Sequence, residues 1–343
     1  MTKHTVRNNY LDFLKGFAII FVVLGHSIQL TGGIEFANYL LFFYNPLFII
    51  IYSFHMPLFM LISGYLFSFT SKKRNIGSII KNRIRTLLVP ITIWTLIWFT
   101  IDHYLNGKML LSLNEVLEYF TGTFWFLWSV LVCSLIVMLV DKTTKGKLSF
   151  VIYCIIFALS FISLDQYSFH MHKYMFPFFL AGYYTNKYEN TLKVSKRVEA
   201  ILACICLIVF GFLFKMYTID TSIYISMFSI LGRSAETIIY YDMYRYAIGF
   251  VGCFLALFAL KHIYKWVPDS IKHWISDMGK NSLGIYIISN FLFIFLIKRL
   301  FAPLQGLNYC VVGIVSIIML LLCNVITQQI KKSKICSVLL FGR

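Results

Sequence analysis

Residues 11–30 read LDFLKGFAIIFVVLGHSIQL, an apolar run that contains the ionisable residues Asp12, Lys15 and His26. A helix that crosses the hydrocarbon core of a membrane, which is about 30 Å thick, needs about 20 mostly apolar residues. The run is too long for the apolar region of a secretory signal peptide, and no A-x-A-like cleavage site follows it. We therefore expect a retained transmembrane helix that carries three costly polar side chains.

The rest of the chain has the same apolar character. Of its 343 residues, 59% are hydrophobic and 13% are charged, whereas about 25% of the residues of an ordinary soluble domain are charged. Too little polar surface is left to cover a water-soluble globule, which excludes a soluble enzyme. We expect a single membrane-embedded domain over residues 1–343, with no appended soluble domain.

Ten apolar runs predict an all-α fold, a polytopic membrane helix bundle of about ten transmembrane helices. The second run contains Pro46 and Pro57 and is too long for one straight span, so part of it could be interfacial or re-entrant. The sixth run is short and is interrupted by Pro177. The runs cover residues 11–30, 42–69, 86–104, 121–140, 148–164, 174–186, 198–217, 246–260, 282–297 and 309–328.

The charge pattern predicts the orientation of this bundle. The chain has 31 Lys and Arg against 14 Asp and Glu, a net charge of +17. With the amino terminus in the cytoplasm, most basic residues fall in inner loops, as the positive-inside rule requires. We expect a multi-pass protein of the inner (plasma) membrane, in contact with the lipid bilayer, with both termini cytoplasmic. No basic stripe suggests nucleic acid as a partner, and the pattern leaves the oligomeric state open. The outer side would hold Lys108, Lys173, Lys215, Arg233, Arg245, Lys298 and Arg299.

Lys15 and His26 share one face of the first predicted helix. A rotation of about 100° per residue leaves them about 20° apart around the axis and about 16 Å apart along it. Asp12 can pair with Lys15, but it lies about 21 Å below His26 and cannot orient the imidazole. A structural role also fits, since Lys15 could reach the inner interface and His26 could hydrogen-bond a neighbouring helix.

A second histidine, His55, lies two residues before Pro57 and is followed by Ser63-Gly64. Two histidines within membrane spans favour a functional site. Pro57 also frees a backbone carbonyl one turn earlier, and Ser63-Gly64 allows a close helix approach. The segment could therefore instead be a kinked packing face.

The inner loop at residues 71–86 is strongly basic and contains no acidic residue. Arg83 and Arg85 could grip the phosphates of a nucleotide-bearing acyl donor through charge-assisted hydrogen bonds. A basic run beside a span also suits anionic lipid and correct insertion, so both explanations stay open.

Several of these segments, taken in order, resemble integral-membrane acyltransferase family 3. They are Lys15-Gly16 to Gly25-His26-Ser27, Phe54-His55-Met56-Pro57 to Ser63-Gly64-Tyr65, Arg83 to Pro90, Trp125-Phe126-Leu127, Phe178 to Gly182 and Asn281-Ser282-Leu283-Gly284-Ile285-Tyr286. The series covers nearly the whole chain. It is most similar to the stand-alone members that resemble fucose 4-O-acetylases and surface-polysaccharide O-acetyltransferases.

The resemblance implies a ten-span fold that takes an acyl group from cytoplasmic acetyl-CoA and delivers it to a glycan hydroxyl. It also implies that the essential Arg and His of the family's first span correspond to Lys15 and His26. Lysine cannot form the bidentate fork of arginine, although the fucose-acetylase-like members also carry Lys at this place. Ser289 stands where the family often has a histidine, which weakens the case for a second base there.

We therefore predict a membrane O-acyltransferase, most simply an O-acetyltransferase, that uses acyl-CoA and a sugar hydroxyl of a surface polysaccharide or lipid-linked glycan. His26 would be the general base, with His55 beside it as a hydrogen-bond or acid partner. Lys15, Arg83 and Arg85 would engage the acetyl-CoA donor. The alternative is a multi-span transporter or exporter of a glycan or lipid-linked sugar. The lack of an inverted repeat and of a carboxylate relay stands against that alternative.

Aromatic residues toward the predicted outer face are candidates for holding the sugar acceptor. Tyr240, Tyr241 and Tyr244 fall in the outer loop predicted between the seventh and eighth spans, and Trp125 lies in the fourth span. An interfacial aromatic belt would explain them equally well. The eight cysteines lie mostly in apolar runs without metal-ligand spacing, so we expect packing residues and no metal. The outer loop would also carry Arg233, Glu236, Asp242 and Arg245.

Overall fold

The computed structural model describes residues 9–107, 109, 112–144, 146–162, 167–189, 191, 194–225, 230 and 234–343. All regular secondary structure in these residues is helical, which confirms the predicted all-α class. Some of the loop cations that support the predicted orientation lie outside the described residues, namely Lys3, Arg7, Lys108, Lys145, Lys193 and Arg233.

The chain divides into two compact units, each built from two separate stretches of sequence. The first contains Met1–His55 and Cys253–Lys332, and the second contains Met56–Gly252 and Ser333–Arg343. Two of the three divisions fall inside long helices, α3 (Pro46–Lys73) and α11 (Ala235–Trp266), and the third falls just after Lys332. Neither unit is therefore one continuous segment of the chain.

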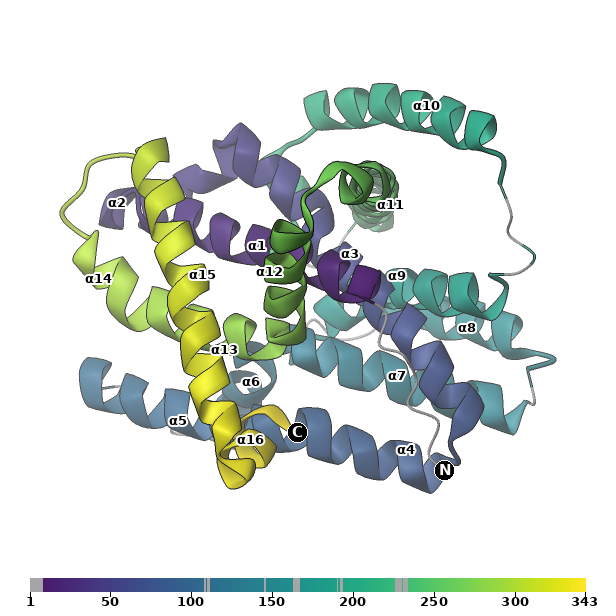
Figure 1. The fold of residues 1–343 in the computed structure, drawn as a ribbon, viewed down its shortest axis with the longest axis horizontal. Helices are drawn as coiled ribbons and strands as arrows, with labels where there is room; N and C mark the ends of the chain where they lie inside the picture. The colour runs from purple at the N-terminus through teal and green to yellow at the C-terminus, as the bar shows by residue number, and fades with distance from the viewer. Residues whose placement is uncertain are drawn as a thin grey trace. The chain divides into compact units, whose positions relative to one another are not determined.

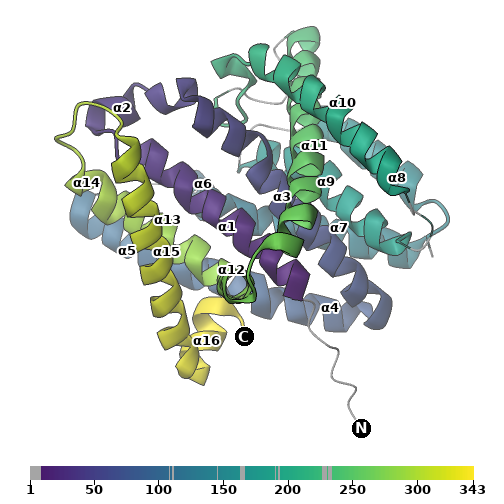
Figure 2. The same cartoon turned by 45° about the horizontal axis from the view of Figure 1, so that its top comes forward.

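In the first unit, α1 (Asn9–Leu30) lies against α12 (Asp269–Lys280), as Figures 1 and 2 show. Glycines make this approach possible. A Cβ atom on Gly16 would lie 1.9 Å from the carbonyl oxygen of Ile275, and one on Gly279 would lie 1.8 Å from that of Asp12. The Lys15-Gly16 motif is thus held against α12 by a backbone contact that no larger residue at position 16 permits.

The half of α1 that carries His26 is fixed by α15 (Tyr309–Lys332), which also packs against α13 (Ser282–Leu292). Ser316 Oγ donates a hydrogen bond to Ser27 Oγ at 2.9 Å. A Cβ atom on Gly284 would lie 2.4 Å from Cγ2 of Thr327, so glycine is needed there too. The unit also contains α2 (Ile34–Asn38), the 3₁₀ turn η1 (Leu41–Tyr44), the π-helical turn η5 (Phe293–Ile297) and α14 (Lys298–Leu300).

In the second unit, α3 and α9 (Phe169–Lys187) meet through two glycines. A Cβ atom on Gly64 would lie 2.0 Å from the carbonyl oxygen of Phe179, and one on Gly182 would lie 1.9 Å from that of Leu61. This confirms the close helix approach expected at Ser63-Gly64. α9 also packs beside α7 (Trp125–Thr143) in Figure 1. The unit also contains α4 (Ile76–Arg83), α5 (Val89–Asn106), α6 (Leu113–Thr123), α8 (Ser149–Leu159), η3 (Ser160–Ile162), α10 (Lys196–Lys215), η4 (Ile219–Thr221) and α16 (Lys334–Phe341).

Helices α4 and α5 are joined by η2 (Ile84–Leu88), a single π-helical turn. Pro90 explains this turn, because proline lacks the N–H that would bond the carbonyl of residue 86 and its ring would clash with that carbonyl. α16 packs against the same segment, where Trp94 Nε1 donates to the carbonyl oxygen of Leu340 at 2.9 Å.

Eight helices in the described part of the chain are long and apolar enough to cross a membrane, and each matches one of the predicted runs. Of the other two predicted spans, 148–164 falls on the short α8 and η3, and 174–186 falls within α9. The count of ten spans and the cytoplasmic termini stay predictions.

Two boundaries differ from the sequence prediction. α3 runs as one 28-residue helix through Pro57, after the first residues of the predicted run in η1, and α9 runs through Pro177. A proline removes one hydrogen bond and bends a helix, but the packed turns on either side continue it.

Candidate active site

Lys15 is anchored by Asp12, one turn away on α1. The two side chains form the predicted ion pair, with Lys15 Nζ 2.6 Å from Asp12 Oδ1. The Asp12 side chain is 4% exposed and the Lys15 side chain is 17% exposed. The carboxylate therefore fixes the lysine while leaving part of its side chain accessible.

His26 lies in the other half of α1 and is half-buried. The side chain of Gln29 lies close to its imidazole, whose ring centroid lies 5.7 Å from that of Phe293 in η5. The oxygen of Gln29 can accept the imidazole N–H and so fix the tautomer, a role that carboxylates often fill. Sequence reasoning missed Gln29, although its i, i+3 spacing places it beside His26 on a helix.

His55 is buried, with 3% of the residue exposed. Its Nδ1 atom lies 2.8 Å from the carbonyl oxygen of Ile51. Because a carbonyl can only accept, the hydrogen belongs on Nδ1 and the lone pair on Nε2. The neutral imidazole of His55 is therefore prepared to accept a proton or a hydrogen bond at Nε2.

The first unit brings the two histidines together. His26 and His55 lie close enough for their charges to interact. Tyr52 lies beside His55, with ring centroids 4.6 Å apart, and it interacts electrostatically with Tyr286 of α13. Gly25 makes room for this tyrosine, since a Cβ atom there would lie 2.5 Å from Cε2 of Tyr52. Two imidazoles and two phenols from α1, α3 and α13 are thus gathered in one region.

Such a group of side chains can move a proton and donate hydrogen bonds to a developing oxyanion. Sequence reasoning gave no role to Tyr52 or Tyr286. The first stands three residues before His55, and the second belongs to the Ile285-Tyr286 motif. Among the described residues, no cluster of three or more His, Cys, Asp or Glu could hold a metal ion.

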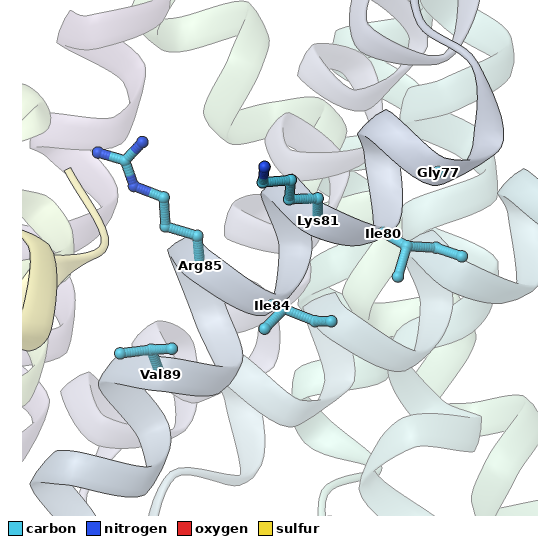
Figure 3. A pocket seen from close by; sticks show the side chains of 6 residues that line it. All are labelled: Gly77, Ile80, Lys81, Ile84, Arg85 and Val89. Atoms are coloured by element: carbon cyan, nitrogen blue, oxygen red, sulfur yellow. The ribbon is translucent and has the colours of Figure 1, made fainter.

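The second unit places Arg83 and Arg85 in different surroundings. The guanidinium carbon of Arg83 lies 4.7 Å from the ring centroid of Phe67, and its Nε atom is buried without a hydrogen-bond partner among the residues that the structure describes. Arg85 is exposed and lines an open groove of about 390 Å³ with Lys81, shown in Figure 3. Residues two apart on a helix face different ways, which separates the two arginines.

The prediction of an outer loop at residues 240–245 was wrong, because these residues belong to α11. Tyr240 is 47% exposed. The ring centroid of Tyr241 lies 5.8 Å from the guanidinium carbon of Arg245. Tyr244 is buried, and its hydroxyl donates to the carbonyl oxygen of Leu213 at 3.0 Å. Trp125 begins α7, with its ring centroid 6.1 Å from that of Tyr224.

The charged residues Asp242 and Arg245 suggested a loop, but with Lys173 they form a buried ion cluster. Lys173 Nζ lies 2.6 Å from Asp242 Oδ2, and Arg245 Nη1 lies 3.1 Å from Asp242 Oδ1. All three side chains are at most 3% exposed. Paired charges can be buried inside a membrane protein, so Lys173 and Arg245 are not loop cations. Arg245 also donates to the carbonyl oxygens of Asp220, Thr221 and Ser222.

These features define a class of protein. Eight helices suited to a bilayer make the chain a multi-pass membrane protein, and the histidine pair in α1 and α3 is its candidate centre for proton transfer. Residues 8–328 match the family described as "Acyltransferase domain", and the chain belongs to this family. It is therefore a multi-pass member of a membrane acyltransferase family, which confirms the resemblance seen in the motifs.

Two relatives that the chain matches share one name, "Nodulation protein NolL". The chain is 33% identical over 220 residues to "Nodulation protein NolL" of Sinorhizobium fredii, which covers 60% of this chain and 58% of that protein. It is 32% identical over 184 residues to "Nodulation protein NolL" of Mesorhizobium japonicum, which covers 52% and 47% respectively. The chain thus spans about half the length of the curated relatives it matches. No solved structure matches it.

Proposed function

We propose that this membrane acyltransferase takes an acyl group, most simply acetyl, from cytoplasmic acyl-CoA and transfers it to a sugar hydroxyl of a surface polysaccharide or lipid-linked glycan. The observation that carries the proposal is the proximity of His26 and His55 within an acyltransferase domain. A neutral imidazole has a ring nitrogen that can accept the proton of a hydroxyl, which is the role that general-base catalysis requires.

In the proposed step, His26 takes the proton of the acceptor hydroxyl as that oxygen attacks the thioester carbonyl carbon. A C–O bond forms, the C–S bond of acyl-CoA breaks, and the departing sulfur receives the proton. The products are an O-acyl sugar and free CoA thiol. Gln29 supports this role by fixing the imidazole of His26.

The tautomer of His55 limits what this residue can do in the transfer step. Its N–H faces the carbonyl of Ile51, so neutral His55 has no hydrogen to donate from Nε2. It can therefore accept a hydrogen bond from its neighbours as it stands, and it would have to take up a proton at Nε2 before it could act as an acid there. Tyr52 and Tyr286 would be the nearby donors for the oxyanion.

The donor is proposed to contact basic residues at Lys15 and in the segment that contains Arg83 and Arg85. Arg83 has the stronger support of the two arginines, because its buried Nε has no hydrogen-bond partner among the described residues. A buried guanidinium with an unused donor favours an anionic ligand. Arg85 is exposed and lies beside Lys81 on another side of the segment. Lys15, held by Asp12, would supply a point charge.

For the acceptor, we propose that Trp125, Tyr240 and Tyr241 offer ring faces to the sugar. Tyr244 would act indirectly, because its hydroxyl is already bonded to the backbone of α10.

The test uses the purified full-length protein in lipid nanodiscs with labelled acetyl-CoA and lipid-linked glycans from the host cell. The proposal expects label on a glycan hydroxyl, together with release of CoA thiol, and loss of both in His26→Ala. Mass spectrometry of surface glycans from cells with and without the chain would identify the sugar. Movement of a glycan across the membrane without any CoA dependence would instead support an exporter and overturn the proposal.

A further inference from the structure

An amphipathic groove lies on the exposed side of α4 and η2. It belongs to the second unit, whereas the histidine pair belongs to the first. It is lined by Gly77, Ile80, Lys81, Ile84, Arg85 and Val89. Figure 3 shows the side chains of Lys81 and Arg85 extending in the same direction from successive turns, whereas Ile80 and Ile84 point to the adjoining side. The groove therefore has a cationic edge and an aliphatic wall.

The cationic edge has no internal counter-charge. Within the described residues, neither Lys81 nor Arg85 makes an ion pair or a side-chain hydrogen bond, and both are exposed. Residues 71–86 contain no Asp or Glu that could neutralise them. Two adjacent unpaired cations fit an anion that both can contact.

The aliphatic wall lies where a membrane span begins. Ile80 is 36% exposed and Ile84 is 45% exposed, and both belong to the stretch Ile76–Asn106 that is suited to crossing a membrane. At Gly77 the groove is open, since a Cβ atom there would have no neighbour within 4 Å. Apolar side chains exposed at this position favour contact with acyl chains.

We propose that this groove binds an anionic phospholipid. The lipid phosphate would lie between Lys81 Nζ and the guanidinium of Arg85, and an acyl chain would run along Ile80, Ile84 and Val89. A water-soluble nucleotide such as the CoA moiety matches the two cations but leaves the aliphatic wall uncovered, whereas a phospholipid satisfies both. Arg85 is then a lipid ligand, and Arg83, on another face, is the donor candidate.

The test compares two double variants of the full-length protein, each of which removes two positive charges from the same basic segment. Lys81→Gln with Arg85→Gln removes the cationic edge, and Lys72→Gln with Lys73→Gln is the matched control, because those two exposed lysines do not line the groove. Native mass spectrometry of the purified protein measures the affinity for phosphatidylglycerol and for phosphatidylcholine.

The wild type and the control should prefer phosphatidylglycerol, and the groove variant should bind it about 30-fold more weakly, since each basic residue near the lipid surface contributes about 1 kcal/mol. Lys81→Arg with Arg85→Lys keeps both charges and should keep the preference. Ile84→Ser should lower the affinity for phosphatidylglycerol and for phosphatidylcholine by the same factor.

Three results would overturn the proposal. They are equal affinity of the wild type for the two lipids, an equal loss in the control variant, and displacement of phosphatidylglycerol by acetyl-CoA. The second would indicate diffuse attraction of the whole basic segment, and the third would make the groove part of the donor site.

Discussion

Asp242→Asn should destabilise the second unit strongly. The carboxylate is 0% exposed and holds Lys173 at 2.6 Å and Arg245 at 3.1 Å. Asparagine removes its charge and leaves two cations buried near each other. Removing one partner of a buried ion pair costs about 3–5 kcal/mol, and the upper end of that range is expected because this carboxylate contacts two buried cations.

The matched control is Asp269→Asn, which makes the same chemical change in an exposed pair. Asp269 lies 3.0 Å from Lys272, but its side chain is 83% exposed. Solvent screens such a pair, so its loss should produce no measurable change in stability. The free energy of unfolding can be followed by tryptophan fluorescence during titration of detergent-solubilised protein with a denaturing detergent.

Adding Lys173→Met to Asp242→Asn should recover part of the lost stability, because the double variant no longer buries the ammonium group of Lys173 beside the guanidinium of Arg245. Equal stability of the Asp242→Asn and Asp269→Asn variants would refute the assignment of a buried ion cluster. A double variant no more stable than Asp242→Asn alone would show that repulsion between the cations is not the cause.

Three further predictions concern other parts of the molecule. Gly279→Val should destabilise the protein by about 1–3 kcal/mol in thermal unfolding, because a Cβ atom there would lie 1.8 Å from the carbonyl oxygen of Asp12. Gly77→Val serves as the control, because a Cβ atom at Gly77 would have no neighbour within 4 Å. Lys15→Ala should raise the Kd for acetyl-CoA in calorimetry while Lys15→Arg keeps substantial activity, and equal binding by all three proteins would contradict a donor role. Tyr244→Phe should cost about 1 kcal/mol of stability through the lost hydrogen bond to Leu213 with no change in acceptor KM, and a raised KM at unchanged stability would show direct contact with the acceptor.

The sequence predicted the features that depend on local periodicity. Helical geometry alone put Lys15 and His26 on one face and paired Asp12 with Lys15, and the ion pair at 2.6 Å confirms the second point. The approach of His26 to His55 could not be predicted, because it depends on how α1, α3 and α13 pack. Gly25 and Tyr52 become meaningful only once that packing is known.

Elsewhere, predictions from single residues failed, because tertiary contacts compensated for residues that disfavour a buried helix. Pro57 and Pro177 suggested breaks, yet the packed turns around them continue as helix. Asp242 and Arg245 suggested a loop, yet each neutralises the other inside α11. The grouping of Arg83 with Arg85 followed from sequence proximity, whereas helix geometry separates them and pairs Arg85 with Lys81 instead.

The role of His26 as the general base can be tested by single-turnover acetyl transfer in nanodiscs, with acetyl-CoA affinity measured by calorimetry on the same preparation. For His26→Ala that unfolds at the wild-type temperature, acetyl-CoA affinity should be unchanged and the transfer rate should fall by about 10² or more, the usual size of a general-base contribution. Well-folded His26→Ala protein that transfers acetyl at the wild-type rate would contradict the role proposed for the histidine pair.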